Sequence, residues 1–175
     1  SNKTWSCVAY GGGMFVAGAS NSETNSKNTN MMYSADGVSW TSTPSAFPDA
    51  TPVTDVTYGN GRFVAVNGSS NSVRSMYSND GITWQASGLP QTSTWTAIVY
   101  GGNKFVALAS SAPGSLVSQI AYSTDGGSWT VVNAAEKNQW RGLTYGNGMW
   151  VAVSSDGTNQ VQYSTDGALT WTSAS

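Results

Sequence analysis

Residues 53–65 read Val-Thr-Asp-Val-Thr-Tyr-Gly-Asn-Gly-Arg-Phe-Val-Ala, with a Gly-Asn-Gly turn between two short apolar runs. Asn-Gly between apolar runs is a strong hairpin signal, because both residues tolerate positive φ. Close variants of this stretch begin at Trp5, Trp95 and Trp140. The sequence therefore predicts a β-hairpin that the chain contains four times.

A second motif, Tyr-Ser-x-Asp-Gly followed by a tryptophan, comes after each of these hairpins. Its copies occupy residues 33–40, 77–84, 122–129 and 163–171, and their tryptophans lie 44, 45 and 42 residues apart. Asp-Gly predicts a further hairpin, so each repeat holds four short strands, which is the content of one propeller blade. No segment shows sustained helical periodicity. We predict an all-β chain that forms a small β-propeller of four four-stranded blades, with about 44 residues per repeat.

The repeats divide the chain into one propeller domain over residues 1–175. Its blades are expected at approximately 4–43, 52–87, 94–133 and 139–173. The first repeat begins with its first strand and the last ends with its fourth, so no strand remains to complete a blade shared by both termini. We expect closure by packing of the first blade against the fourth. Association of two chains into a larger ring is the alternative.

Composition excludes several classes of function. Seven basic and nine acidic residues leave a net charge of −2, and charged residues make up only 9% of the chain. A phosphate-backbone binder needs a clustered cationic face, so we expect no nucleic-acid partner. The chain has no histidine and a single cysteine, Cys7, so we predict no metal site, no disulfide and no cofactor. No apolar run reaches the ~18 residues of a membrane span, so membrane insertion is not expected.

The Ser-x-Asp-Gly…Trp segments resemble the Asp boxes of sialidase-type propellers, as found in assorted bacterial and phage surface proteins. Three copies are one residue shorter than the usual Ser-x-Asp-x-Gly-x-x-Trp, and the fourth has Ala168 where that family has glycine. The box is a structural turn in that family. The resemblance therefore implies that each acid braces its own turn and each tryptophan anchors the following strand. The residues concerned are Asp36, Trp40, Asp80, Trp84, Asp125, Trp129, Asp166 and Trp171.

Candidate binding residues lie where the four repeats differ. The connections between the second and third strands, and between successive repeats, vary widely and emerge on one side of a propeller, a usual place for binding. The candidates there are Phe47, Asp49, Arg74, Glu136, Lys137 and Asp156. Asp55 and Arg141 are charged residues unique to their repeats in the first strand, which lines the central channel. They either orient a polar ligand or satisfy buried polar groups.

No catalytic residue is predicted. The three arginines cannot form the carboxylate clamp of a sialidase, because Arg62 lies at a turn on the opposite side from Arg74 and Arg141. We predict a non-enzymatic recognition or structural module, located outside the cell, on the cell surface or on a virion. Its expected partner is a glycan or a protein surface, including other virion or filament subunits. The alternatives are a purely structural virion or filament subunit and a sialidase-like glycoside hydrolase.

Overall fold

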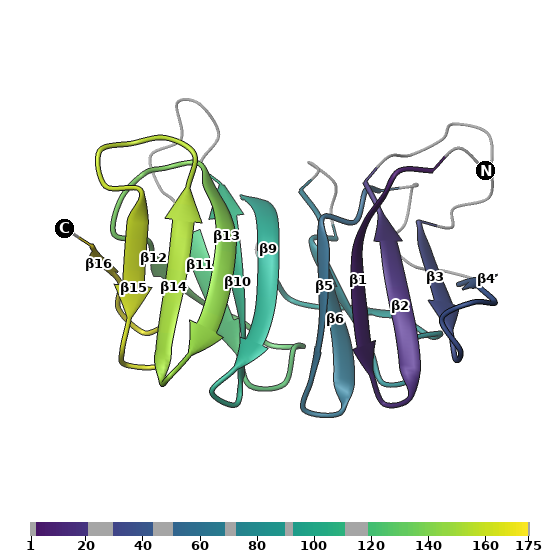
Figure 1. The fold of residues 1–175 in the computed structure, drawn as a ribbon. Helices are drawn as coiled ribbons and strands as arrows, with labels where there is room; N and C mark the ends of the chain where they lie inside the picture. The colour runs from purple at the N-terminus through teal and green to yellow at the C-terminus, as the bar shows by residue number, and fades with distance from the viewer. Residues whose placement is uncertain are drawn as a thin grey trace.

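The computed structural model describes residues 3–20, 30–43, 51–68, 73–89, 93–110 and 119–174. Within these ranges the chain forms four separate antiparallel sheets of four strands each and no helix (Figure 1). The strands of each sheet follow one another in chain order. Each sheet is therefore one propeller blade, and the predicted all-β fold with four four-stranded blades is confirmed.

We call the strands of each blade A to D in chain order. Blade 1 consists of β1 (Trp5–Gly11), β2 (Met14–Ala19), β3 (Met31–Ser34) and β4 (Thr41–Ser42). Blade 2 consists of β5 (Asp55–Gly59), β6 (Arg62–Val66), β7 (Ser75–Ser78) and β8 (Gln85–Ala86). Blade 3 consists of β9 (Thr94–Gly101), β10 (Lys104–Ser110), β11 (Gln119–Ser123) and β12 (Thr130–Asn133). Blade 4 consists of β13 (Trp140–Gly146), β14 (Met149–Ser154), β15 (Val161–Ser164) and β16 (Thr172–Ser173).

The turn between strands A and B shows how local sequence sets the register of a blade. In blade 2, Asn60 and Gly61 have φ angles of 47° and 77°, which place both residues in the left-handed region. This geometry joins two adjacent strands with the twist that a tight hairpin requires. Gly59 therefore pairs with Arg62, and the pairing continues to Asp55 opposite Val66.

The two rims of the molecule differ in their connections (Figure 1). The A–B and C–D turns lie on the lower rim, which we call the turn side. The described parts of the B–C and D–A connections lie on the upper rim, which we call the loop side. The short turns repeat closely between blades, whereas the loop-side connections vary in length and composition.

Among the described residues, the core consists of three apolar clusters, each lying between two neighbouring blades. The first cluster joins blades 1 and 2 and includes Val16 and Trp84. The second joins blades 2 and 3 around the fully buried Trp95, and the third joins blades 3 and 4 around Trp140 and Trp150. Because each blade is a single sheet, it buries its apolar faces only against its neighbours.

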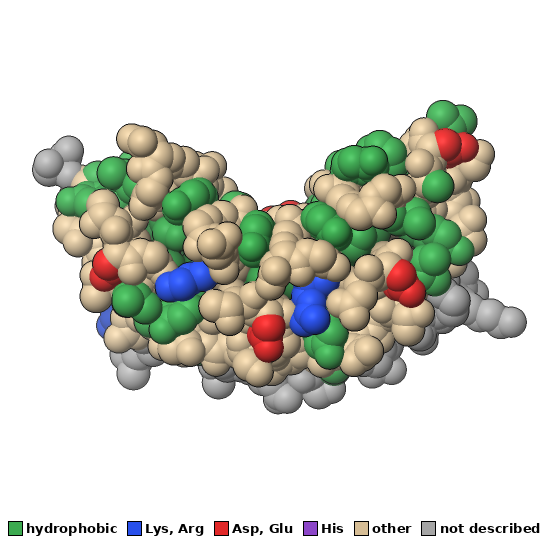
Figure 2. All heavy atoms as spheres, turned by 90° about the horizontal axis from the view of Figure 1, so that it is seen from below, with side chains coloured by type: hydrophobic (Ala, Val, Ile, Leu, Met, Phe, Trp, Pro, Cys, Tyr) green, Lys and Arg blue, Asp and Glu red, His purple; other side chains and the backbone are tan. Residues whose placement is uncertain are grey.

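The blades form an open arc, so the closed monomeric ring that we expected is wrong. Strand β1 packs beside β5, β5 beside β9 and β9 beside β13, and within the described strands no comparable contact joins β13 to β1. Figure 2 shows the arc from the turn side, hollowed at its centre and open between its two arms. Four blades close a ring only if each sheet turns a quarter circle from the one before. The continuous apolar packing between neighbouring blades holds them at a smaller angle.

Candidate interaction surfaces

The Ser-x-Asp-Gly turns on the turn side are held by hydrogen bonds to their own aspartates. The Asp36 carboxylate accepts hydrogen bonds from the backbone amides of Val38 and Ser39 at 2.8 and 2.7 Å, and from the Ser34 hydroxyl at 2.9 Å. Asp80 and Asp125 accept the equivalent hydrogen bonds in blades 2 and 3. These carboxylates therefore satisfy backbone donors that the turn leaves without strand partners.

The fourth turn accommodates its extra residue by a different hydrogen-bond pattern. Ala168 has a φ of 68°, and its amide donates to the Ser164 hydroxyl at 3.0 Å. The Thr170 hydroxyl and amide donate to Asp166 at 2.6 and 3.1 Å. The carboxylate remains a brace within its own turn, so the longer spacing changes the register of the turn and keeps the role of its acid.

The hydrogen bonds in these turns favour the ionised carboxylates, so the folded protein lowers the pKa of each aspartate. The amides of Ser39 and Val38 hold the pKa of Asp36 at about 2. For Asp80, desolvation is the largest single effect and acts upward, but the amides and hydroxyls of the turn together outweigh it. The aspartates with a lowered pKa are Asp36, Asp80, Asp125 and Asp166.

Acidification is expected to destabilise the protein below about pH 5, because these aspartates have a pKa near 3.9 in the unfolded chain. Their contribution is fully present above that value and is lost as the pH falls toward the folded pKa, which is about 2 for Asp36. Asp55 acts in the opposite direction, since its desolvated carboxyl has a raised pKa. The four turn aspartates together lose more stabilising free energy on protonation than Asp55 gains. The melting temperature should therefore fall steadily as the pH is lowered from 5. A melting temperature that stays constant or rises down to about pH 3 would contradict this.

The cations of the turn side contribute to packing between blades. The Arg62 guanidinium lies 4.8 Å from the centre of the Tyr77 ring and donates a hydrogen bond to the backbone oxygen of Asp125 in blade 3. Lys104 Nζ lies 4.7 Å from the centre of the Tyr122 ring and donates to the Gly167 oxygen of blade 4 at 2.8 Å. Figure 2 shows the basic and acidic side chains spread over this face.

On the loop side, the fold brings together Glu136, Lys137, Arg141 and Asp156 of the predicted binding residues, all near the start of blade 4. Glu136 accepts hydrogen bonds from Asn159 and, at 3.0 Å, from the Ser173 hydroxyl. Asp156 accepts the Gln139 amide at 2.5 Å. Both carboxylates therefore brace the loops around β13. Lys137 and Arg141 are exposed instead.

Arg141 lies at the loop-side end of β13 and is hydrogen-bonded only to neutral groups in the described structure. Its Nε donates to the Ser155 hydroxyl at 3.3 Å, and its Nη2 donates to the Gln139 side-chain oxygen at 2.9 Å. These bonds orient the guanidinium without neutralising its charge. The side chain remains exposed at the inner rim of the arc.

The other predicted binding residues lie elsewhere. Asp55 accepts the Ile98 amide of blade 3 at 2.8 Å and the Val56 amide at 2.9 Å, so it links blades 2 and 3. Arg74 is only 6% exposed, and desolvation lowers its pKa. Phe47 and Asp49 lie outside the described residues.

The described residues contain no group of three or more acids or cysteines placed to hold a metal ion. Each Ser-x-Asp-Gly turn offers one carboxylate, whereas calcium takes several converging oxygen ligands. Addition of EDTA is therefore expected to leave the melting temperature unchanged. A fall of several degrees that calcium restores would contradict this prediction.

The outer faces of the two terminal blades were missed by the sequence reasoning. The exposed side of blade 1, which we call the first end face, carries Trp5, Val8, Tyr10, Phe15, Met32 and Trp40. Val8 and Tyr10 are 62% and 60% exposed, while Val56, the counterpart of Val8 in blade 2, is 5% exposed. A hollow of about 530 Å³ opens on this face and is lined by residues that include Trp5, Met32 and Trp40.

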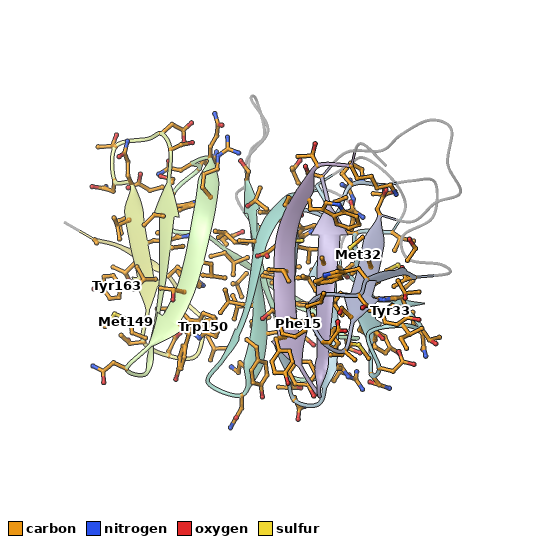
Figure 3. All side chains as sticks on the ribbon, turned by 45° about the vertical axis from the view of Figure 1, so that its right-hand side comes forward. Phe15, Met32, Tyr33, Met149, Trp150 and Tyr163 are labelled. Carbon is orange, nitrogen blue, oxygen red and sulfur yellow. The ribbon has the colours of Figure 1, made fainter. Side chains whose placement is uncertain are left out.

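The outer side of blade 4, which we call the last end face, is also apolar. It carries Gly146, Met149, Val151, Val153, Val161 and Tyr163. Figure 3 shows Met149 and Tyr163 on this blade and Phe15 and Met32 on blade 1. The repeat pattern could have predicted these two end faces. Each repeat buries side chains against its neighbours, so an open row of repeats leaves those side chains exposed on its first and last members.

No helix in the described ranges has the length and apolar character that crossing a bilayer would require.

Comparisons with known proteins agree with this architecture. No curated protein matches the chain significantly. YCF48 from Cyanidioschyzon merolae is 13% identical with a TM-score of 0.67, covering 99% of this chain and 56% of the other. YCF48 bound to D1 peptide is 14% identical with a TM-score of 0.65, covering 98% of this chain and 52% of the other. This chain therefore spans about half the length of these YCF48 chains.

A designed protein, Ika4, matches with 15% identity and a TM-score of 0.60, covering 93% of this chain and 92% of the other. At such low identities these likenesses show the fold alone. The family model of the DUF6242 beta propeller domain matches residues 1–140. The match covers more than half of the chain and spans its first three blades, so the chain belongs to the DUF6242 beta propeller domain family.

Proposed function

We propose that this propeller is a non-enzymatic recognition module that binds an acidic segment of another protein on the loop side of blade 4. The proposal is carried by the two exposed cations, Lys137 and Arg141, near the start of β13. A propeller blade is a rigid support, and variable connections on a rigid support are a common place for binding. An arginine fork matches a carboxylate in both charge and shape.

The acids around these two cations are held by neutral hydrogen-bond donors of the protein, and within the described residues neither acid forms an ion pair with Lys137 or Arg141. Glu136 is hydrogen-bonded to Asn159 and Ser173, and Asp156 to the backbone of Gln139. The hydrogen bond from Asn159 is the main cause of the lowered pKa of Glu136. The rim is thereby pre-organised, which reduces the entropy lost on binding. A peptide-bound structural neighbour, YCF48 bound to D1 peptide, supports a protein segment as the partner.

The same hydrogen bonds support a role without catalysis. A general acid at neutral pH needs a raised pKa, whereas the turn aspartates and Glu136 have lowered ones. Asp55 has a raised pKa, but its two oxygens accept the backbone amides of Ile98 and Val56. This carboxyl is therefore committed to joining blades 2 and 3.

We extend the proposal to a location outside the cell or on a virion. A chain with only 9% charged residues and many Ser, Thr, Asn and Gly residues supports this location by association of composition alone. The same polar residues suit hydrogen bonding to a glycan, which is the competing partner. The test below separates the two.

The test is binding of the chain to a peptide array with acidic, neutral and basic sets, beside a glycan array. We expect selective binding to the acidic peptides, weakened at least tenfold by Arg141→Gln and further by adding Lys137→Gln. Each lost charge-assisted contact is worth about 1.5–3 kcal/mol. Binding should also weaken as salt is raised.

The matched control is Arg62→Gln, which removes the same charge from the turn side. It should leave peptide binding unchanged. Binding to glycans alone, or binding abolished by Arg62→Gln and unaffected by Arg141→Gln, would contradict the proposed partner or the proposed side.

A further inference from the structure

The two end faces of the arc are the two halves of one missing interface between blades. We propose that two copies of this chain pack end to end, with blade 4 of each copy against blade 1 of the other, to form a closed ring of eight blades. This assembly goes beyond the proposed function and does not depend on it.

A tyrosine and a glycine identify the missing interface. In each internal interface, the tyrosine of strand A lies over a glycine of the blade before it. A Cβ built on Gly11 would lie 2.0 Å from the Tyr58 ring, one on Gly59 would lie 1.9 Å from Tyr100, and one on Gly101 would lie 2.5 Å from Tyr145.

The fourth pair of the series is split between the two ends of the chain. A Cβ built on Gly146 of blade 4 meets no atom within 4 Å. Tyr10 of blade 1 is the corresponding tyrosine, and it is 60% exposed. Packing Tyr10 of one copy over Gly146 of the other would complete the pattern that the chain uses three times.

Near the turn side, the two end faces also carry the two halves of a contact that the internal interfaces make. Val16 and Met14 of blade 1 lie against Gly81 in the Ser-x-Asp-Gly turn of blade 2, at 2.8 and 3.3 Å from a Cβ built there. Blade 4 presents the same two residue types at these positions, Val151 and Met149, and neither has a following blade to contact. For the turn glycine of blade 1, Gly37, the three atoms nearest to a built Cβ all belong to Phe15 of its own blade.

A hydrogen-bond series along strand A also stops at the last blade. The Ser6 hydroxyl donates to the Val53 oxygen of the next blade at 3.2 Å, Thr54 donates to Trp95 at 2.9 Å and Thr96 to Trp140 at 3.0 Å. The corresponding position in blade 4 is Arg141, whose guanidinium donates to the side chains of Ser155 and Gln139 instead.

The shape of the arc suits closure by a second copy. In Figure 1 the outer faces of blades 1 and 4 both point toward the viewer, and in Figure 2 the two arms of the arc extend in the same direction. Half a ring whose ends face one way is completed by another half related by a two-fold axis. The resulting eight blades lie within the range that propellers adopt, about 4–8.

A second copy is the occupant that we infer because this chain supplies both halves of the interface in matching positions. The first end face presents Trp5, Val8 and Tyr10 beside its hollow of about 530 Å³, and a contiguous exposed apolar patch marks an interaction site. The last end face carries the types of side chain that fill the equivalent space between blades 1 and 2.

The experiment is light scattering after size exclusion over a range of concentrations. We expect a particle of twice the chain mass of 18.2 kDa that dissociates on dilution. Tyr10→Lys and Gly146→Trp should each reduce it to a single chain mass. Both variants should keep the parent's β-sheet circular dichroism, because Tyr10 is exposed and Gly146 has open space and no positive φ.

Leu169→Lys is the matched control. Leu169 is 45% exposed, so the substitution changes charge and apolar surface as Tyr10→Lys does, but in the Ser-x-Asp-Gly turn of blade 4, which lies on the turn side rather than on the end faces. It should leave the double mass unchanged. Mixing Tyr10→Lys with Gly146→Trp should restore some association, because one of the two interfaces then pairs an intact Tyr10 with an intact Gly146.

Three outcomes would overturn the proposal. A single chain mass at every concentration would mean that another partner or further blades cover the end faces. Loss of the dimer on Tyr10→Lys but not on Gly146→Trp would mean that two first end faces pack together. A series of masses above the dimer would mean that end-to-end contacts propagate into an open filament.

Discussion

Gly59→Ala is expected to lower the free energy of unfolding by about 3 kcal/mol or more, the upper end of what overpacking costs, or to prevent folding. The added Cβ would lie 1.9 Å from Cγ of Tyr100. The Tyr100 ring cannot easily move, because it packs against Phe105 with ring centres 4.8 Å apart. The backbone of Gly59 is held as well, since it pairs with Arg62 across the hairpin. Urea unfolding followed by far-ultraviolet circular dichroism measures the change.

Gly127→Ala is the control for the conformational effect of adding a methyl group. A Cβ on Gly127 would come no closer than 3.7 Å to another residue, and the same turn position holds Val38 in blade 1 and Ile82 in blade 2. Its effect should stay within about 0.5 kcal/mol. Unfolding of both variants at the parent's urea concentration would show that the tyrosine and glycine contacts do not hold the blades together.

Trp84→Ala should cost about 3–5 kcal/mol, the usual loss for a buried tryptophan. Trp84 is 6% exposed and belongs to the cluster between blades 1 and 2, and its Nε1 donates to the Gly81 oxygen at 3.3 Å. Asp80→Ala should cost less, about 1–2 kcal/mol, because water can reach the amides that the carboxylate leaves. Chemical unfolding measures both variants.

Trp40→Ala is the positional control, since Trp40 occupies the same turn position in blade 1 and is only half-buried on the first end face. Both tryptophan variants are compared in the Tyr10→Lys background, so that association of copies does not add to their stability. Trp40→Ala should then cost less than half as much as Trp84→Ala. Equal losses, or normal stability with lost peptide binding in the Trp84 variant, would contradict the structural role assigned to these residues.

The sequence was sufficient to predict the blades because their signals are local and repeated. Asn60 and Gly61 encode the tight A–B turn through their own backbone preferences, and the turn appears with the φ angles those residues favour. The acid of each Ser-x-Asp-Gly turn likewise bonds groups within four residues of itself. Because the same two turn motifs recur in the same order in all four repeats, the strand order within each blade could be predicted.

The candidate binding residues were harder to interpret from sequence, because a charge unique to one repeat has two explanations. Asp55 links blades 2 and 3 by accepting the Ile98 amide, 43 positions along the chain. Glu136 and Asp156 also brace distant loops, while Lys137 and Arg141 stay exposed. Which charges are engaged depends on partners far away in sequence, so composition and spacing could not separate them.

The sequence by itself determined the unit of this protein: a four-stranded blade, its two turns and the number of its copies. Only the tertiary structure decided whether the copies close on themselves. Closure depends on the angle between neighbouring sheets, which side chains such as Tyr58 over Gly11 set by packing across each interface. Repeated over three interfaces, that angle leaves blades 1 and 4 apart. Tyr10 and Gly146 occupy the same motif positions as the tyrosines and glycines of the other blades. They are nevertheless exposed, because they lie on the two end faces of the arc.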